Sequence, residues 1–100
     1  MKDTIKVVVK EPGKPFEVRE VKNTLGQLQE LVGGYIETVT LYTNAAIICN
    51  EEGRLKGLPE QRVFGAQWAG TVALVGVDGD EFDDVPEIAI NHPKLFGLEE

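Results

Sequence analysis

Apolar and polar side chains alternate along the first twenty residues. Residues 5–10, IKVVVK, place β-branched side chains at every second position, which is typical of a β-strand. Residues 11–15, EPGKP, predict a turn, because proline fixes φ and glycine supplies a positive φ. Residues 16–19, FEVR, resume the alternation, so we expect the two strands to form a hairpin.

The spacing of apolar positions then changes to that of a helix. Apolar residues recur three or four positions apart, at Leu25, Leu28, Leu31 and Val32. Thr24 with Gln27 fits a capping box, and Gly33-Gly34 stand where a left-handed C-terminal cap is favoured. A helix of about ten residues is marginal alone, so we expect its apolar stripe to pack on a sheet.

Three later segments have the composition of strands. Residues 35–42, YIETVTLY, are mostly aromatic or β-branched, whereas 45–49, AAIIC, and 70–77, GTVALVGV, are nearly continuous apolar runs. Pairing of the first two is favoured by their order in the chain. The face that we expect to point to the core carries Tyr35, Glu37, Val39 and Leu41. Glu37 should then be partly buried with a polar partner, since burying an unpaired acid is costly.

The other segments are predicted to be loops and one short helix. Residues 50–65 are expected to be irregular, because a Gly-Leu-Pro triplet at 57–59 interrupts any long element. Asp78-Gly79 predicts a turn, and residues 87–91 predict a short helix that Pro93 ends.

Together these elements predict an α+β fold. We expect a mainly antiparallel sheet of about five strands, with one short helix packed across a face. A chain of 100 residues corresponds to a single domain, residues 1–100. The sequence has no apolar run near the ~20 residues that span a bilayer, and its first residues lack a secretory apolar region. With Cys49 expected as a buried, reduced thiol, these features favour the cytoplasm.

The net charge of −7 is unevenly distributed. Residues 1–62 carry nine basic and nine acidic side chains, whereas residues 63–100 carry Lys94 and eight acids. Phosphate would repel the last third, which argues against direct nucleic-acid binding there. This third is either a solvated acidic surface or a surface that imitates nucleic acid or meets a basic partner.

Catalytic and metal sites lack their usual residues. The chain has one cysteine, Cys49, and one histidine, His92, and nothing in their positions places them together as a nucleophile and a base. The residues for a zinc site are also absent. The acidic run DGDEFDD at 78–84 has Phe82 at a ligand position and lacks the late glutamate of a calcium loop. We therefore expect no enzyme, no cofactor and no metal.

The segment at residues 48–62, ICNEEGRLKGLPEQR, gathers three of the chain's ten basic residues. Arginine offers a planar set of donors for carboxylate or phosphate, and a tryptophan nearby could stack on a base. The predicted ligand-binding residues are Asn50, Arg54, Lys56, Arg62, Trp68 and Glu37. In the alternative interpretation, the cations balance Glu51, Glu52 and Glu60, and Trp68 belongs to the core.

Three stretches, IKVVVKEPGKPFEVRE, LQELVGGYIE and ICNEEGRLKGLPEQR, resemble the domain of unknown function 3846 family. The resemblance covers residues 4–78, and the chain departs from it at Glu60-Gln61, where the family often has Pro-Asn. It implies a small protein of phages or conjugative elements, and therefore the host cytoplasm. It implies neither an enzyme nor a substrate.

Three functions are compatible with these features. The first is a non-catalytic binding protein that sequesters a host nucleotide signal in a nucleotide-like small-molecule site at a subunit interface, which would make the protein a homo-oligomer. The second is an acidic DNA mimic or anti-restriction protein that uses residues 78–87 to bind a host defence protein. The third is a structural or accessory interaction module. None of them calls for a membrane.

Overall fold

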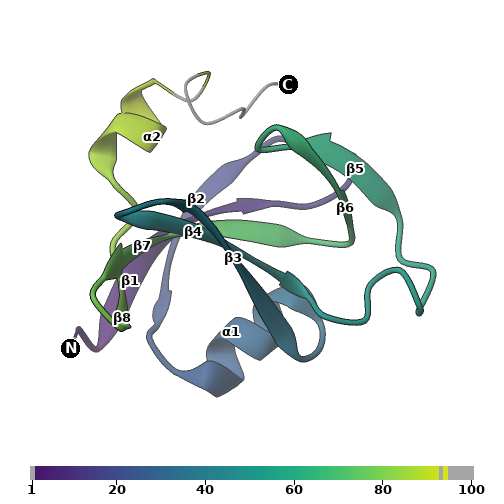
Figure 1. The fold of residues 1–100 in the computed structure, drawn as a ribbon, viewed down its shortest axis with the longest axis horizontal. Coiled ribbons are helices and arrows are strands. Elements are labelled where there is room, and N and C mark those ends of the chain that lie inside the picture. Colours follow the sequence, from purple (N-terminus) through teal and green to yellow (C-terminus); the bar gives the residue numbers. More distant parts are fainter. Residues whose placement is uncertain (1, 93, 95–100) are drawn as a thin grey trace.

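The computed structural model describes residues 2–92 and 94, which form eight strands and two short helices (Figure 1). In chain order these elements are β1 (Thr4–Lys10), β2 (Glu17–Lys22), α1 (Leu25–Val32), β3 (Ile36–Tyr42), β4 (Ala45–Asn50), β5 (Glu60–Val63), β6 (Ala66–Ala69), β7 (Val72–Asp78), β8 (Glu81–Asp83) and α2 (Glu87–Asn91). Within the described residues, neither helix has the length and apolar character needed to cross a bilayer.

Six strands form one antiparallel sheet, and the other two form a separate hairpin. The sheet has the order β2-β1-β7-β4-β3, and β8 pairs with the end of β7. The hairpin consists of β5 and β6. Helix α1 lies across one face of the sheet (Figure 1). The predicted α+β fold with a mainly antiparallel sheet and one helix across a face is confirmed.

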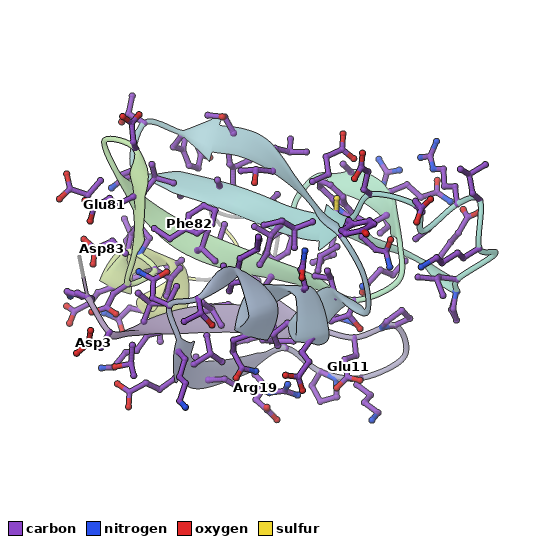
Figure 2. All side chains as sticks on the ribbon, turned by 90° about the horizontal axis from the view of Figure 1, so that it is seen from below. Asp3, Glu11, Arg19, Glu81, Phe82 and Asp83 are labelled. Atoms are coloured by element: carbon purple, nitrogen blue, oxygen red, sulfur yellow. The ribbon has the colours of Figure 1, made fainter. Side chains whose placement is uncertain are left out.

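Strands β4 and β7, and β1 from Val7 to Val9, are buried on both faces, which explains their apolar runs. Every residue of β4 is buried. Ile48 of β4 and Val75 of β7 pack with Leu28 and Val32 of α1 on one face of the sheet, and Figure 2 shows the helix lying against that face. This packing holds a helix of eight residues that would not be stable alone.

The C-cap of α1 agrees with the sequence, but its capping box and its apolar stripe do so only in part. Thr24 Oγ1 accepts a hydrogen bond from the Gln27 backbone N–H at 3.2 Å, whereas the Thr24 backbone N–H donates to the Lys22 carbonyl at 2.9 Å. Gly33 adopts a φ of 80° at the C-cap, as predicted. Leu25, predicted to face the sheet, is 60% exposed. That prediction is wrong, because the helix contacts the core through the later positions Leu28 and Val32.

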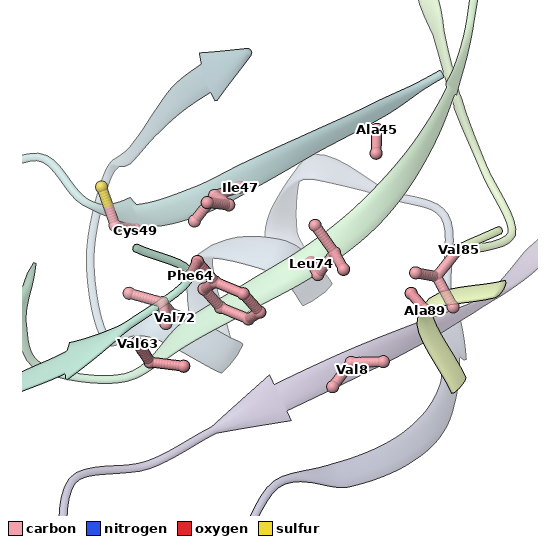
Figure 3. Packing of buried hydrophobic residues seen from close by; sticks show 10 residues of the cluster. All are labelled: Val8, Ala45, Ile47, Cys49, Val63, Phe64, Val72, Leu74, Val85 and Ala89. Atoms are coloured by element: carbon pink, nitrogen blue, oxygen red, sulfur yellow. The ribbon is translucent and has the colours of Figure 1, made fainter. Parts of the chain in front are cut away.

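The opposite face of the sheet is covered by the β5–β6 hairpin and α2 (Figure 3). Val63 and Phe64 from the hairpin, and Val85 and Ala89 from the α2 segment, form one core cluster with side chains of the sheet. The prediction of irregular structure over residues 50–65 is therefore wrong for β5.

The β5–β6 hairpin was not predicted from the sequence because its turn has unusual residues. Phe64 and Gly65 connect the strands with φ values of 54° and 73°, as in a type I′ turn, where Asn-Gly is the usual signal. Here the first turn residue is a phenylalanine that is 4% exposed. Burial of its ring thus offsets a backbone conformation that large side chains rarely adopt.

Strand β3 is an edge of the sheet, and its predicted core face is wrong. Tyr35 is 65% exposed and Val39 37% exposed, and Glu37 is exposed as well. Leu41 is partly buried against one core cluster and Ile36 against the other. An edge strand has a neighbour on one side only, so an aromatic and β-branched composition does not ensure burial.

The acidic segment forms the β7–β8 hairpin, which packs beside the start of the chain. The predicted turn at Asp78-Gly79 is confirmed, since Asp78 pairs with Glu81 across the turn. Glu81 and Asp83 lie at the same end of the molecule as Asp3 (Figure 2). The predicted helix over residues 87–91 is confirmed as α2; Pro93 lies outside the described residues.

Candidate functional site

A cavity lies between the end of β4, the loop that follows it and strand β6. Its volume is about 270 Å³, near the lower end of the roughly 300–1,000 Å³ that is usual for small-molecule sites. Four of the six predicted ligand-binding side chains line it: Glu37, Asn50, Arg54 and Trp68. The fold thus brings together residues from β3, β4, the following loop and β6.

Asn50 fixes the start of the loop. Its side chain is 6% exposed, and its Nδ2 donates to the Val32 carbonyl at 3.1 Å while its Oδ1 accepts from the Glu52 N–H at 2.8 Å. The first bond satisfies a carbonyl at the end of α1, which lacks an intrahelical partner. Asn50 therefore positions the loop against α1, and it also lines the cavity.

Residues 51–57 form tight turns that pack closely on β6. The Lys56 N–H donates to the Glu52 carbonyl at 3.0 Å, and the Gly57 N–H donates to the Arg54 carbonyl at 3.1 Å. A Cβ atom at Gly53 would lie 2.4 Å from the Ala69 carbonyl oxygen, so this approach requires glycine. The turns leave Leu55 87% exposed at the tip of the loop.

Trp68 serves both the core and the cavity. Its Nε1 donates to the Val63 carbonyl at 2.7 Å, so the indole is held within its own hairpin. Its ring is half-buried against the core cluster of the second face and also lines the cavity. The Trp68 ring therefore belongs in part to the core, and another part of it faces the cavity.

The three predicted cations have different surroundings. Arg54 lines the cavity, and within residues 2–92 and 94 it has no carboxylate within 4.0 Å. Lys56 lies 3.8 Å from Glu52 and lines a neighbouring groove of about 350 Å³ at the end of α1. Arg62 is exposed on β5, opposite Gln67, and is not among the described residues that line either hollow.

Glu37 and Cys49 meet at one wall of the cavity. The Cys49 thiol donates to the Glu37 carbonyl at 3.7 Å, and its Sγ lies 3.9 Å from the Glu37 carboxylate Oε1. Burial, assisted by the negative charge of Glu37, raises the pKa of Cys49 to about 11. The prediction that Glu37 has a polar partner is confirmed, but its predicted partial burial is wrong. Cys49 is buried and free, as predicted.

Six lining residues were not predicted from the sequence. They are Cys49, Glu51, Gly53, Leu55, Gln67 and Ala69. Gln67 becomes a candidate only when the β5–β6 hairpin is known, because the hairpin returns β6 to the loop, where Ala69 lies against Gly53. Glu51 and Leu55 belong to the loop that was predicted to bind a ligand, but neither was itself predicted to line the site.

The lining supplies two carboxylates, one guanidinium and one aromatic ring, from Glu37, Glu51, Arg54 and Trp68. Cys49 is held as a neutral thiol at physiological pH, since its pKa is about 11 and the thiolate is the nucleophilic form. His92 follows α2 and is absent from the lining. Across the described part of the chain, no three His, Cys, Asp or Glu side chains are grouped to hold a metal ion. The lining can accept and donate hydrogen bonds and offers an aromatic surface.

Comparison with known proteins identifies a family. No curated protein and no solved structure matches the chain. A family model described as "Domain of unknown function (DUF3846)" matches residues 5–96. The match extends beyond residue 78, so the shorter range expected from the resemblance is wrong. Because the match covers nearly the whole sequence, the chain belongs to the DUF3846 family.

Proposed function

We propose that the protein is a non-catalytic binding protein whose cavity takes a small nucleotide-like molecule. The observation that carries this proposal is the meeting of Glu37, Arg54 and Trp68 around one cavity of about 270 Å³. Such a volume suits one nucleoside or mononucleotide better than a larger ligand.

The charges of the lining favour a ligand with both N–H donors and a single anionic group. Trp68 offers an aromatic surface on which a base can stack. The carboxylates of Glu37 and Glu51 accept hydrogen bonds from ring and exocyclic N–H groups. Arg54, which has no carboxylate partner in the described chain, supplies donors to one phosphate or carboxylate. Two acids beside one arginine disfavour a polyphosphate.

The biological role that we propose is sequestration of a host nucleotide signal by a phage or mobile element. The resemblance noted in the sequence supports this context, and the neutral thiol of Cys49 supports binding without turnover. A protein that acts by sequestration needs affinity and a sufficient concentration, and it needs no catalytic group.

The test is titration with nucleosides, nucleoside monophosphates and cyclic nucleotides. The chain contains a single tryptophan, so quenching of its fluorescence reports a base that stacks on Trp68, and calorimetry gives the affinity. Arg54→Gln should weaken binding of an anionic ligand by about 10- to 150-fold, since a charged hydrogen bond contributes roughly 1.5–3 kcal/mol. The matched control is Arg62→Gln, which removes an exposed arginine outside the cavity and should leave the affinity unchanged.

Other outcomes of these experiments would favour a different function. Equal losses in Arg54→Gln and Arg62→Gln would indicate diffuse electrostatic attraction and reject this cavity. Absence of any nucleotide response, together with inhibition of a DNA-binding host enzyme that is lost in Asp78→Asn/Asp80→Asn, would favour the acidic mimic. Absence of both responses would favour a structural or accessory module.

A further inference from the structure

The charged side chains that line the cavity are not paired with one another. Among the residues that the structure describes, Glu37 and Glu51 have no basic group within 4.0 Å, and Arg54 has no carboxylate within that distance. All three line the same cavity. The acids therefore keep acceptors, and the arginine keeps donors, for a bound molecule.

The other donors among the lining side chains are already engaged within the protein. Four more lining side chains can donate a hydrogen bond, and each donates to a carbonyl or a carboxylate of the chain. These donors are Asn50, Cys49, Gln67 and Trp68, and their acceptors belong to Val32, Glu37, Glu60 and Val63. The described lining thus offers a ligand more acceptors than donors, so the ligand has to supply N–H groups of its own.

Among the nucleic-acid bases, guanine has the edge that suits a carboxylate best. The two oxygens of a carboxylate accept well from two N–H groups that lie side by side. Guanine presents its N1–H and its 2-amino group together on one edge. Adenine and cytosine place a ring acceptor beside their amino group, and uracil flanks its N–H with two carbonyls. Those acceptors would face the carboxylate, and a site built for donors rejects a ligand that lacks them.

Of the two acids, Glu37 has the more firmly held position. It lies on β3 and pairs with Cys49 of β4, whereas Glu51 lies in the turn after β4. The Cys49 Sγ is 3.9 Å from the Glu37 Oε1, a long contact that leaves the carboxylate able to accept from a ligand. Side chains on strands are placed more precisely than side chains on loops. Glu37 is therefore the acceptor that the sheet positions for recognition.

We propose that the cavity selects a guanine base, whose N1–H and 2-amino groups donate to the Glu37 carboxylate while its ring stacks on Trp68. The indole is held in place for stacking, because its Nε1 donates to the Val63 carbonyl at 2.7 Å. Arg54 binds one anionic group on the attached sugar. This inference rests on the proposed function and names the base that the site takes.

The experiment compares the monophosphates of guanosine, inosine and adenosine by calorimetry and by quenching of the tryptophan fluorescence. Inosine monophosphate keeps the N1–H but lacks the 2-amino group. It should bind the wild type about tenfold more weakly than guanosine monophosphate, because one hydrogen bond to a charged acceptor is lost. Adenosine monophosphate lacks both donors and should bind more weakly still.

Two variants with the same change of charge locate the recognition. Glu37→Gln replaces one acceptor oxygen by an amide donor, so guanosine and inosine monophosphates should bind this variant with nearly equal affinity. Glu51→Gln is the matched control, since it removes the same charge from the same cavity. It should keep the roughly tenfold preference for guanosine monophosphate. Both positions are exposed, so urea denaturation should show that both variants fold with the stability of the wild type.

The outcomes separate this inference from the proposed function. Equal binding of guanosine and inosine monophosphates to the wild type would overturn guanine recognition and leave nucleotide binding standing. A preference that survives Glu37→Gln would also overturn the inference, because a different group would then recognise the base. Absence of binding by any nucleotide would reject both the inference and the proposed function.

Discussion

Asn50 and Gly53 line the cavity and show how single residues set its shape through their own contacts. The Asn50 Nδ2 donates to the Val32 carbonyl at the end of α1, and its Oδ1 accepts from the Glu52 N–H in the loop. Gly53 allows the loop to approach the Ala69 carbonyl. Replacing either residue would move the wall that carries Arg54. A loss of binding in such variants would therefore report on positioning.

Two glycines provide opposite predictions for stability. Gly53→Ala would put a Cβ atom 2.4 Å from the Ala69 carbonyl oxygen, and we expect this overpacking to destabilise the protein by about 1–3 kcal/mol. Gly26→Ala has nothing within 4 Å of the new atom and lies in α1, so we expect stabilisation by roughly 0.5–1 kcal/mol. Urea denaturation of both variants measures these changes. A stable Gly53→Ala protein would show that the loop can move away from β6.

At the scale of elements, Asp84 joins the acidic hairpin to the first strand. Its Oδ1 accepts from the Lys6 backbone N–H at 2.8 Å, and its Oδ2 lies 2.7 Å from Lys2 Nζ. The Val85 N–H donates to the Lys6 carbonyl at 2.8 Å. These bonds extend the β1 side of the sheet past the point where β7 pairs with β8. A close approach of Asp84 to Gly76 completes the junction.

This junction predicts an acid-sensitive stability. The hydrogen bond from Lys2, assisted by that from the Lys6 N–H, lowers the pKa of Asp84 below its ordinary value of 3.8. The folded state therefore binds this proton less tightly than the unfolded state does. The stabilisation is fully present above about pH 4 and is lost as the pH falls through the lowered pKa.

The measurement is the urea concentration at the midpoint of unfolding, determined at several pH values between 7 and 2.5. Asp84→Asn should lower the midpoint modestly at pH 7 and reduce its fall in acid, because the ionised acceptor is absent at both ends of the range. Asp80→Asn is the matched control, since Asp80 lies in the adjoining turn without a hydrogen bond or ion pair among the described residues. Identical acid profiles for wild type and Asp84→Asn would contradict the assignment.

Local patterns in the sequence predict the elements whose neighbours are close in the chain. The β1–β2 hairpin and α1 with its Thr24 and Gly33 caps were of this kind. The β5–β6 hairpin was not, because its turn signal is hidden by a buried phenylalanine at position 64. Gln61 anchors this hairpin to the sheet by donating to the carbonyls of Lys10 at 2.9 Å and Gly70 at 2.8 Å, and no local pattern indicates these distant contacts.

Some residues of the candidate site could likewise be predicted from the local sequence, and others could not. The cavity position of Arg54 followed from the cations of its loop, and that of Trp68 from its place shortly after them. Glu37 was selected for a wrong reason, since it was expected in the core and lies at an edge. Gln67 reaches the cavity through the β5–β6 pairing, which was not predicted. Cys49 reaches it through the β3–β4 pairing, which was predicted, but Cys49 was expected only as a buried thiol.

At the scale of the whole molecule, the acidic segment at residues 78–84 packs against the start of the chain. Lys2 lies within 3.2 Å of Asp83 and 2.7 Å of Asp84, so two of the acids that give the chain its charge of −7 have a basic partner. The remaining acids of the hairpin, Asp78, Asp80 and Glu81, lie on β7, β8 and the turn between them. This distribution bears directly on whether the segment could hold a divalent cation.

We predict that divalent metal does not contribute to folding stability. A calcium site in residues 78–84 would need six or more oxygen ligands, and the carboxylates of Asp83 and Asp84 are already engaged by Lys2. Binding would have to break that junction and would lose its stabilisation. Thermal unfolding with EDTA and then with excess calcium should give the same melting temperature, because a ligand stabilises only the state that binds it. A shift of more than about 5 °C, or roughly 1 kcal/mol for a domain of this size, would show that the hairpin binds metal. Asp80→Asn should then abolish the shift if the turn supplies a ligand, and its persistence would place the ion elsewhere.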